Sequence, residues 1–162
     1  MNAFLFPGQG SQFVGMAKDL FEENEAARSV LERANTVLDM DLTSIMFGSG
    51  DEAQADADKE RLTQTQNTQP ALFVHSMAVM SALPTGASTP AMVAGHSLGE
   101  YSALAAAGAI SFEEGLRIVR LRGELMAQAG DIRPGSMAAI LGMEDAHVEA
   151  VCKEASGAGI VQ

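Results

Sequence analysis

The sequence contains one cysteine, one tyrosine, no tryptophan and few basic residues. One cysteine cannot form an intramolecular disulfide, so the chain needs no oxidising compartment. Ten lysines and arginines stand against 21 acidic residues, and this formal net charge of −11 repels phosphate backbones and anionic membrane surfaces. Residues 1–10 lack the basic stretch of a signal peptide, and no apolar run approaches the roughly 18 residues of a membrane span. We therefore expect a soluble cytoplasmic protein that binds neither nucleic acid nor membrane.

Two further patterns are missing. No group of cysteines and histidines has the spacing of metal ligands, and no phosphate-binding loop with a following Lys-Ser or Lys-Thr occurs. We accordingly expect no metal and no cofactor. What is present is a globular composition of 162 residues, 47% hydrophobic and 19% charged, which is enough to bury a core.

The first 94 residues contain strand, helix and loop patterns. Short apolar runs typical of buried strands occur at residues 3–6 and again at 91–94, and each ends in a glycine-containing turn. Helical spacing of apolar residues predicts two helices over 14–38, separated near Asn24. The acidic stretch 48–59 has no periodicity, and we interpret it as a solvated surface loop.

Three further helices are predicted before residue 130. An apolar helix is expected over 67–83, with Asn67 or Thr68 as its N-cap and Pro70 in its first turn. A helix rich in alanine follows over 100–107. Ser111 and Glu114 form a capping-box pattern that opens a helix ending near Ala129.

The pattern changes after Pro134. Residues 137–141 are predicted to form a strand, and Ile160 with Val161 to begin another. Between them, residues 145–156 are predicted to form an amphipathic helix whose inward face consists of Val148, Val151, Cys152 and Ala155. Too few strands precede the last residue for a complete parallel sheet, so we expect the N-terminal part of a longer protein.

Gly95, Ser97 and Gly99 match the nucleophile-elbow pattern, in which a serine lies on a tight strand-to-helix turn between small neighbours. The pattern alone is common by chance, but here an apolar strand precedes it and a helix of small residues follows. Such a turn places the Ser97 hydroxyl at the positive end of a helix and leaves the Leu98 amide free to face an oxyanion. We favour a nucleophile over a purely structural turn.

Three arginines on the following helix differ in their neighbours. Arg117 and Arg120 each have a glutamate three or four positions away, and we interpret both as ion-paired on a solvated face. Arg122 has only apolar residues at those positions, so its guanidinium needs an anion from elsewhere. From spacing alone, that anion is either a carboxylate of the fold or a substrate carboxylate held bidentately.

None of the three histidines and the one cysteine is expected to be a nucleophile or its base. His75 lies among apolar residues and is expected to be a hydrogen-bonded core histidine, while His147 is expected to face solvent. His96 adjoins Ser97, but adjacent residues on a tight turn point apart, so it is a candidate for lining the pocket rather than for the serine's base. Cys152 falls on an apolar stripe and is expected in the core.

Three segments carry a family resemblance. Residues 6–12 read Phe-Pro-Gly-Gln-Gly-Ser-Gln, residues 95–101 read Gly-His-Ser-Leu-Gly-Glu-Tyr, and residues 122–126 read Arg-Gly-Glu-Leu-Met. In this order they resemble the bacterial malonyl-CoA:acyl carrier protein transacylases, a family that includes the acyltransferase domains of polyketide and fatty-acid synthases. The resemblance implies an α/β-hydrolase-like acyltransferase lobe, of which residues 1–133 form the N-terminal part. Residues 134–162 then begin an inserted ferredoxin-like α+β lobe.

The resemblance also implies a chemistry and its residues. Ser97 aligns with the nucleophile that takes a malonyl group from malonyl-CoA and passes it to the phosphopantetheine thiol of acyl carrier protein, in fatty-acid biosynthesis. Gln9 and Leu98 match the positions whose amides form the oxyanion hole. Arg122 matches the arginine that pairs with the malonyl carboxylate, and His96 the histidine that helps line the pocket. Malonyl-CoA and acyl carrier protein are thus the expected partners of an expected monomer.

The catalytic histidine of that family lies beyond Gln162, so we expect these 162 residues alone to be inactive. Two alternatives stay open. One is a serine hydrolase or thioesterase, which shares the elbow but uses water as the acceptor, and the other is a non-catalytic acyltransferase-like scaffold. Because the family's carrier proteins are acidic and the chain is too, docking of a carrier would need a local basic patch.

Overall fold

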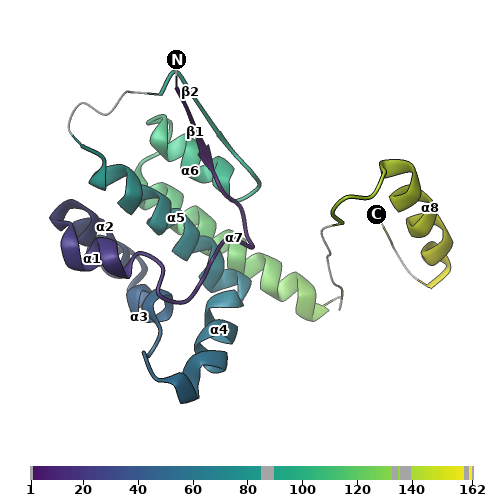
Figure 1. Ribbon diagram of the computed structural model, residues 1–162, viewed down its shortest axis with the longest axis horizontal. Helices are drawn as coiled ribbons and strands as arrows, with labels where there is room; N and C mark the ends of the chain where they lie inside the picture. The colour runs from purple at the N-terminus through teal and green to yellow at the C-terminus, as the bar shows by residue number, and fades with distance from the viewer. Residues whose placement is uncertain (1, 85–89, 133–134, 136–139, 159–160, 162) are drawn as a thin grey trace. The chain divides into compact units, whose positions relative to one another are not determined.

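The computed structural model describes residues 2–84, 90–132, 135, 140–158 and 161 (Figure 1). The chain divides into two compact units, 1–132 and 133–162. The first unit combines a parallel pair of strands with helices, so the predicted α/β class is confirmed. The interpretation of the second unit as the beginning of a ferredoxin-like lobe stays a prediction.

The two strands bring distant parts of the sequence together. β1 (Ala3–Phe6) and β2 (Met92–Gly95) pair in parallel, with Phe6 opposite Gly95, which confirms both predicted strands to within one residue. The His96 amide extends the pairing by donating to the Phe6 carbonyl at 3.1 Å. Because parallel strands end at the same edge of a sheet, the loop after β1 and the turn after β2 start beside one another.

Helices make up most of the first unit. They are α1 (Lys18–Glu23), α2 (Glu25–Leu38), α3 (Leu42–Phe47), α4 (Ala55–Thr63), α5 (Thr65–Ala82), α6 (Gly99–Ala106) and α7 (Phe112–Ile132), with a short 3-10 turn η1 (Glu52–Gln54). Within the described ranges, none of the helices has both the length and the apolar character of a membrane-spanning segment.

Side-chain hydrogen bonds cap the starts of two helices. Asn24 separates α1 from α2, and its side chain accepts a hydrogen bond from the Ala27 amide at 3.0 Å. At the start of α7, Ser111 Oγ accepts from the Glu114 amide at 3.2 Å, and Glu114 Oε2 accepts from the Ser111 amide at 2.9 Å. The break near Asn24 and the capping box are both confirmed.

Helix α5 lies at the centre of the first unit, in contact with α2 and with α7 (Figure 1). Its Phe73 is fully buried, and the ring lies 5.8 Å from the Phe112 ring, centroid to centroid. The helices around α5 contribute further fully buried side chains, among them Leu31, Met46, Leu62, Leu116 and Val119. Full burial of one such side chain stabilises a fold by about 1.5–3 kcal/mol, so the unit is held together mainly through α5.

The expected loop over 48–59 is wrong in part, because η1 and the first residues of α4 lie within it. Its acidic side chains act as local caps. Asp51 accepts a hydrogen bond from the Ala53 amide at 3.0 Å, and Asp58 Oδ2 accepts from the Ser49 amide at 2.7 Å. Hydrogen bonds from the Ser49 hydroxyl and amide lower the pKa of the Asp58 carboxyl. Together with the Asp51 bond they order a segment that has no apolar periodicity.

Helix α5 begins at Thr65, not at the expected cap position 67 or 68. The reason lies outside the helix. Thr68 Oγ1 donates to the Leu62 carbonyl at 2.6 Å, and Asn67 Nδ2 donates to the Arg61 carbonyl at 2.8 Å. Both side chains therefore satisfy the end of α4 instead of capping α5, and Pro70 lies inside the helix.

The second unit contains α8 (Asp145–Ala155) and a 3-10 turn η2 (Ser156–Ala158). The predicted helix is confirmed, but none of its residues is buried, and Val151 is 59% exposed. Its expected inward face thus has no cover among the described residues of this unit. The predicted strand over 137–141 falls largely outside the described residues, as does Ile160.

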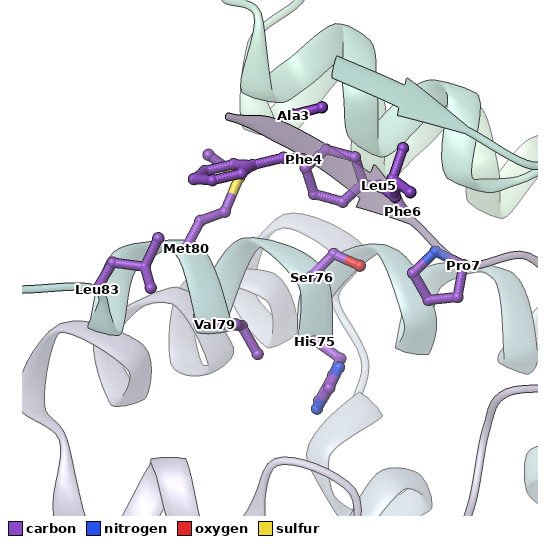
Figure 2. A pocket seen from close by; sticks show the side chains of 10 residues that line it. All are labelled: Ala3, Phe4, Leu5, Phe6, Pro7, His75, Ser76, Val79, Met80 and Leu83. Carbon is purple, nitrogen blue, oxygen red and sulfur yellow. The ribbon is translucent and has the colours of Figure 1, made fainter. Parts of the chain in front are cut away.

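An apolar pocket of about 370 Å³ lies between β1 and α5 (Figure 2). Most of its lining is aliphatic or aromatic, and the polar residues that line it are His75 and Ser76. Ser76 donates to the Leu72 carbonyl of its own helix. His75 is half-buried and makes no hydrogen bond within the described residues, so the expectation of a hydrogen-bonded core histidine is wrong. Burial lowers its pKa, while the nearby Asp19 opposes the shift.

We predict that His75 makes the first unit less stable in acid. Because the pKa of His75 is lower in the folded state, the unfolded state binds a proton more readily. The contribution of His75 to stability is therefore complete above its unfolded pKa of about 6.5. That contribution is lost as the pH falls toward the folded pKa. His75→Gln should flatten the dependence of the unfolding free energy on pH between about 5 and 7, measured by urea denaturation. His147→Gln, at an exposed position, is the control, and equal slopes in the two variants would contradict the prediction.

Candidate active site

Ser97 lies on the turn between β2 and α6, with the positive φ of 54° that a nucleophile elbow requires. Its two glycine neighbours are packed without space for a side chain. A Cβ on Gly95 would lie 2.0 Å from the Gly99 carbonyl carbon, and a Cβ on Gly99 would lie 2.2 Å from the Phe6 carbonyl oxygen. The Ser97 side chain itself is exposed. The sequence-predicted conformation, a serine displayed on a tight strand-to-helix turn, is the one observed.

The loop after β1 lies against this turn. A Cβ on Gly8 would lie 2.7 Å from both Nδ1 and the carbonyl oxygen of His96. The next residue, Gln9, and the residue after the serine, Leu98, donate no backbone hydrogen bond within the described part of the chain. Two backbone amides without an acceptor among the described residues thus lie on adjoining segments.

Arg122 reaches Ser97 from α7. Its Nη2 donates to Ser97 Oγ at 3.1 Å, and its Nη1 donates to Gln69 Oε1 at 2.6 Å. The Cζ atom lies 5.8 Å from the centre of the Tyr101 ring. All three partners are neutral, so the guanidinium is held in place while its charge stays available to a ligand.

No carboxylate of the described residues pairs with Arg122. The ion pairs in this part of the chain are Arg33 with Glu113 and Arg120 with Glu124. The spacing left two possible anions for Arg122, a carboxylate of the fold or a carboxylate of a substrate. Within the described residues, no carboxylate of the fold has this role. Next to Arg122, the exposed side of α7 is an apolar wall formed by Ile118, Leu121, Leu125, Met126 and Ala129.

Gln69 is the residue that sequence reasoning missed. It is fully buried on α5, and besides accepting from Arg122 it donates through Nε2 to Thr65 Oγ1 at 2.9 Å and to Met126 Sδ at 3.2 Å. Thr65 Oγ1 in turn donates to Gln9 Oε1 at 3.1 Å. A continuous series of hydrogen bonds therefore joins Gln9, through Thr65, Gln69 and Arg122, to Ser97. The available signal was a glutamine directly before a run of apolar residues, where a buried amide needs partners.

The remaining candidates make no hydrogen bond to the Ser97 hydroxyl within the described residues. His96 is exposed beside the turn, and its ring makes no hydrogen bond within the described residues. His147 is exposed and Cys152 half-exposed, both in the second unit. No group of three or more His, Cys, Asp or Glu residues gathers as a metal site in the described ranges.

The expectation that Arg120 lies on a solvated face is wrong. Its predicted ion pair with Glu124 is present at 2.7 Å, but the arginine is only partly exposed. Its Nη1 also donates to the Gln66 carbonyl at 2.9 Å and to Asn67 Oδ1 at 3.1 Å. Spacing along α7 could not reveal these bonds, because their acceptors lie more than 50 positions earlier in the sequence.

The chain matches the acyl transferase domain family over residues 3–158 and belongs to it. It is 48% identical over 155 residues to the malonyl CoA-acyl carrier protein transacylase of Staphylococcus aureus (strain COL), an alignment that covers 95% of this chain and 47% of that protein. It is 49% identical over 142 residues to the protein of the same name from Bacillus subtilis (strain 168), covering 88% and 42%.

Solved structures of malonyltransferases also match the chain. The acyl-carrier-protein S-malonyltransferase of Burkholderia pseudomallei 1710b matches with a TM-score of 0.83 at 41% identity, covering 99% of this chain and 50% of that one. A malonyl-transacylase in complex with its type II PKS acyl-carrier protein matches with a TM-score of 0.77 at 38% identity, covering 96% and 48%. The chain thus resembles the N-terminal part of malonyl-CoA:acyl carrier protein transacylases and spans about half the length of these relatives.

We predict that Gly95→Ala destabilises the first unit by at least about 2 kcal/mol, because the new methyl group would overlap backbone atoms of Gly99 that cannot move without opening the turn. Gly130→Ala is the matched control, since a Cβ there meets nothing within 4 Å and alanine favours a helix. Both variants are compared by denaturant unfolding. A Gly95→Ala protein as stable as the Gly130→Ala protein would show that the turn can accept a larger residue.

Proposed function

We propose that the protein carrying this sequence transfers a malonyl group from malonyl-CoA to the phosphopantetheine thiol of acyl carrier protein, through an ester on Ser97. The observation that carries the proposal is the hydrogen bond from Arg122 Nη2 to Ser97 Oγ. It places a cation, which has no carboxylate partner among the described residues, 3.1 Å from the hydroxyl that would be acylated. A malonyl group has its thioester carbonyl and its free carboxylate separated by one carbon, so both ends fit such a pair of groups.

In the first half-reaction, Ser97 Oγ attacks the thioester carbonyl of malonyl-CoA and loses its proton to a general base. The C–S bond then breaks, and coenzyme A leaves as the thiol after taking up that proton. In the second half-reaction the phosphopantetheine thiol attacks the serine ester, the C–O bond breaks, and the proton of the thiol returns to Ser97 Oγ. The sum is a transfer of malonyl between two thiols with no net change in protons.

Negative charge develops twice on the former carbonyl oxygen, once in each half-reaction. The backbone amides of Leu98 and Gln9 are the proposed donors to that oxygen. Support comes from their lack of any other acceptor in the described part of the chain, and from the contact between Gly8 and His96 that holds their segments together. Removing one donor of this kind commonly costs two to three orders of magnitude in turnover.

The malonyl carboxylate is proposed to bind Arg122 and to replace Ser97 as the acceptor of Nη2. The bond from Nη1 to buried Gln69 holds the guanidinium while this exchange takes place. Loss of the bond from Arg122 also frees the serine hydroxyl for attack. His96 is proposed to line the pocket beside the reacting atoms.

The general base is proposed to come from outside these 162 residues. Within the described residues, the side-chain partner of Ser97 is Arg122, a cation that cannot accept a proton, and no histidine hydrogen-bonds to the Ser97 hydroxyl. The relatives are about twice as long, which leaves room for a base in their second half. We therefore propose that the segment alone is inactive, which a malonyl-transfer assay on the segment and on the longer protein would test.

We predict that Arg122→Ala lowers kcat/KM for malonyl-CoA by about 100-fold, because one charged hydrogen-bonded contact of roughly 2–3 kcal/mol is lost. The value for acetyl-CoA, which has no carboxylate, should fall far less. Arg117→Ala is the control, since it removes an exposed arginine of the same helix. An unchanged malonyl-to-acetyl ratio in Arg122→Ala would exclude the carboxylate role.

We predict that [2-14C]malonyl-CoA labels the protein at Ser97 when carrier protein is absent, and that Ser97→Ala abolishes the label. Adding phosphopantetheinylated carrier protein should discharge the label onto the carrier. Discharge to free malonate at the same rate without a carrier would instead indicate a hydrolase. A wild-type protein that neither takes up malonyl nor reacts with a fluorophosphonate probe would indicate a scaffold without this chemistry.

A further inference from the structure

We propose that Arg120 is a positioning residue: together with Gly123 it fixes the turn of α7 that carries Arg122 against the first turn of α5, and so determines where the Arg122 guanidinium lies relative to Gln69 and Ser97. The inference rests on the proposed function, because its measurable consequence is selection for a malonyl donor.

The first observation concerns a carbonyl that α5 cannot satisfy by itself. In an α-helix the carbonyl of Gln66 would accept from the amide of residue 70, but residue 70 is proline, which has no amide hydrogen. Arg120 Nη1 supplies the missing donor at 2.9 Å. The same nitrogen donates to Asn67 Oδ1 at 3.1 Å, so Arg120 binds the first turn of α5 at two successive residues.

The second observation is the close approach of the two backbones at the same place. A Cβ on Gly123 would lie 2.7 Å from Gln66 Cα and 2.8 Å from the Thr65 carbonyl oxygen. Glycine at this position therefore allows α7 to touch the backbone of α5. Arg120 and Gly123 both contact Gln66, and Arg122 lies between them in the sequence.

The contact of Arg120 and Gly123 with α5 also fixes Arg122, because Gln69, the residue that holds the Arg122 guanidinium, lies on α5 as well. Gln69 follows Gln66 by one turn of α5, and Arg122 Nη1 meets its Oε1 at 2.6 Å. Sliding or rotating α7 against Gln66 would separate these atoms and also lengthen the bond to Ser97 Oγ. Misplacement of a binding group by about 1 Å can cost as much as 100-fold in rate, so a small movement here has a functional effect.

Arginine is suited to this position in a way that lysine is not. Its Nε donates to Glu124 Oε1 at 2.7 Å while Nη1, on another corner of the planar guanidinium, binds the two oxygens of α5. A lysine ammonium has one nitrogen for all three acceptors. Arg120→Lys should therefore keep part of the contact, and Arg120→Met should lose it.

The test measures kcat and KM for malonyl-CoA and acetyl-CoA in the full-length enzyme that carries this sequence, with carrier protein as acceptor. Arg120→Met should lower the malonyl-to-acetyl ratio of kcat/KM by about tenfold, mainly through the KM for malonyl-CoA, and Arg120→Lys should lie between this variant and the wild type. Arg117→Met, an exposed arginine one turn earlier, should leave the ratio unchanged. The melting temperature of every variant is measured in parallel.

A double variant separates positioning from general stability. If Arg120 acts through Arg122, then Arg120→Met should not change the ratio further when Arg122→Ala is already present. A fall in melting temperature with an unchanged ratio in both Arg120 variants would overturn the inference, and so would a further change of the ratio in the double variant. If Arg120→Met does not fold, Arg120→Lys decides by the same criterion. A wild-type enzyme without malonyl preference would overturn the proposed function itself, which is a different outcome.

Discussion

The contact between the end of β1 and the turn after β2 is the constraint on which the site depends. The carbonyl oxygen of Phe6 occupies the space that a Cβ at position 99 would need, and backbone atoms of Gly99 occupy the space that a Cβ at position 95 would need. This packing is possible only with glycine at both positions, and it leaves Ser97 with a positive φ and an exposed hydroxyl. Parallel pairing of the strands then places the loop that contains Gln9 against the same turn. The serine and the two free amides therefore depend on one backbone contact.

Helices α5 and α7 form the other half of the site, and α7 supplies hydrogen-bond partners that polar groups of α5 would otherwise lack. Burying the Gln69 amide would be unfavourable without partners, and α7 supplies an arginine nitrogen and a methionine sulfur. Pro70 leaves the Gln66 carbonyl without its helical donor, and α7 supplies Arg120. The polar groups that fix the site are thus also groups that the packing of these helices requires, which explains why a charged residue is held at a defined place beside an apolar wall.

Much of the fold could be predicted because its signals are local. The two strands, the break at Asn24 and the capping box at Ser111 each depend on residues within a few positions of one another, and all three are observed. The start of α5 could not be predicted in this way, since Thr68 satisfies a carbonyl of α4 instead of capping its own helix. The acidic stretch 48–59 lacks periodicity, yet hydrogen bonds that its aspartates accept order it as a turn and a helix start.

For the site, the sequence by itself determined the elbow around Ser97 and the absence of an intrahelical partner for Arg122. Both follow from residue types at short, fixed spacings, because small residues and a turn conformation are properties of a continuous segment. Only the tertiary structure decided that Arg122 meets Ser97 and Gln69, and that Arg120 is bound to α5 rather than to solvent alone. These partners are between 25 and 54 positions apart in the sequence, and only the packing of α7 on α5 and of both strands side by side brings them within hydrogen-bond distance.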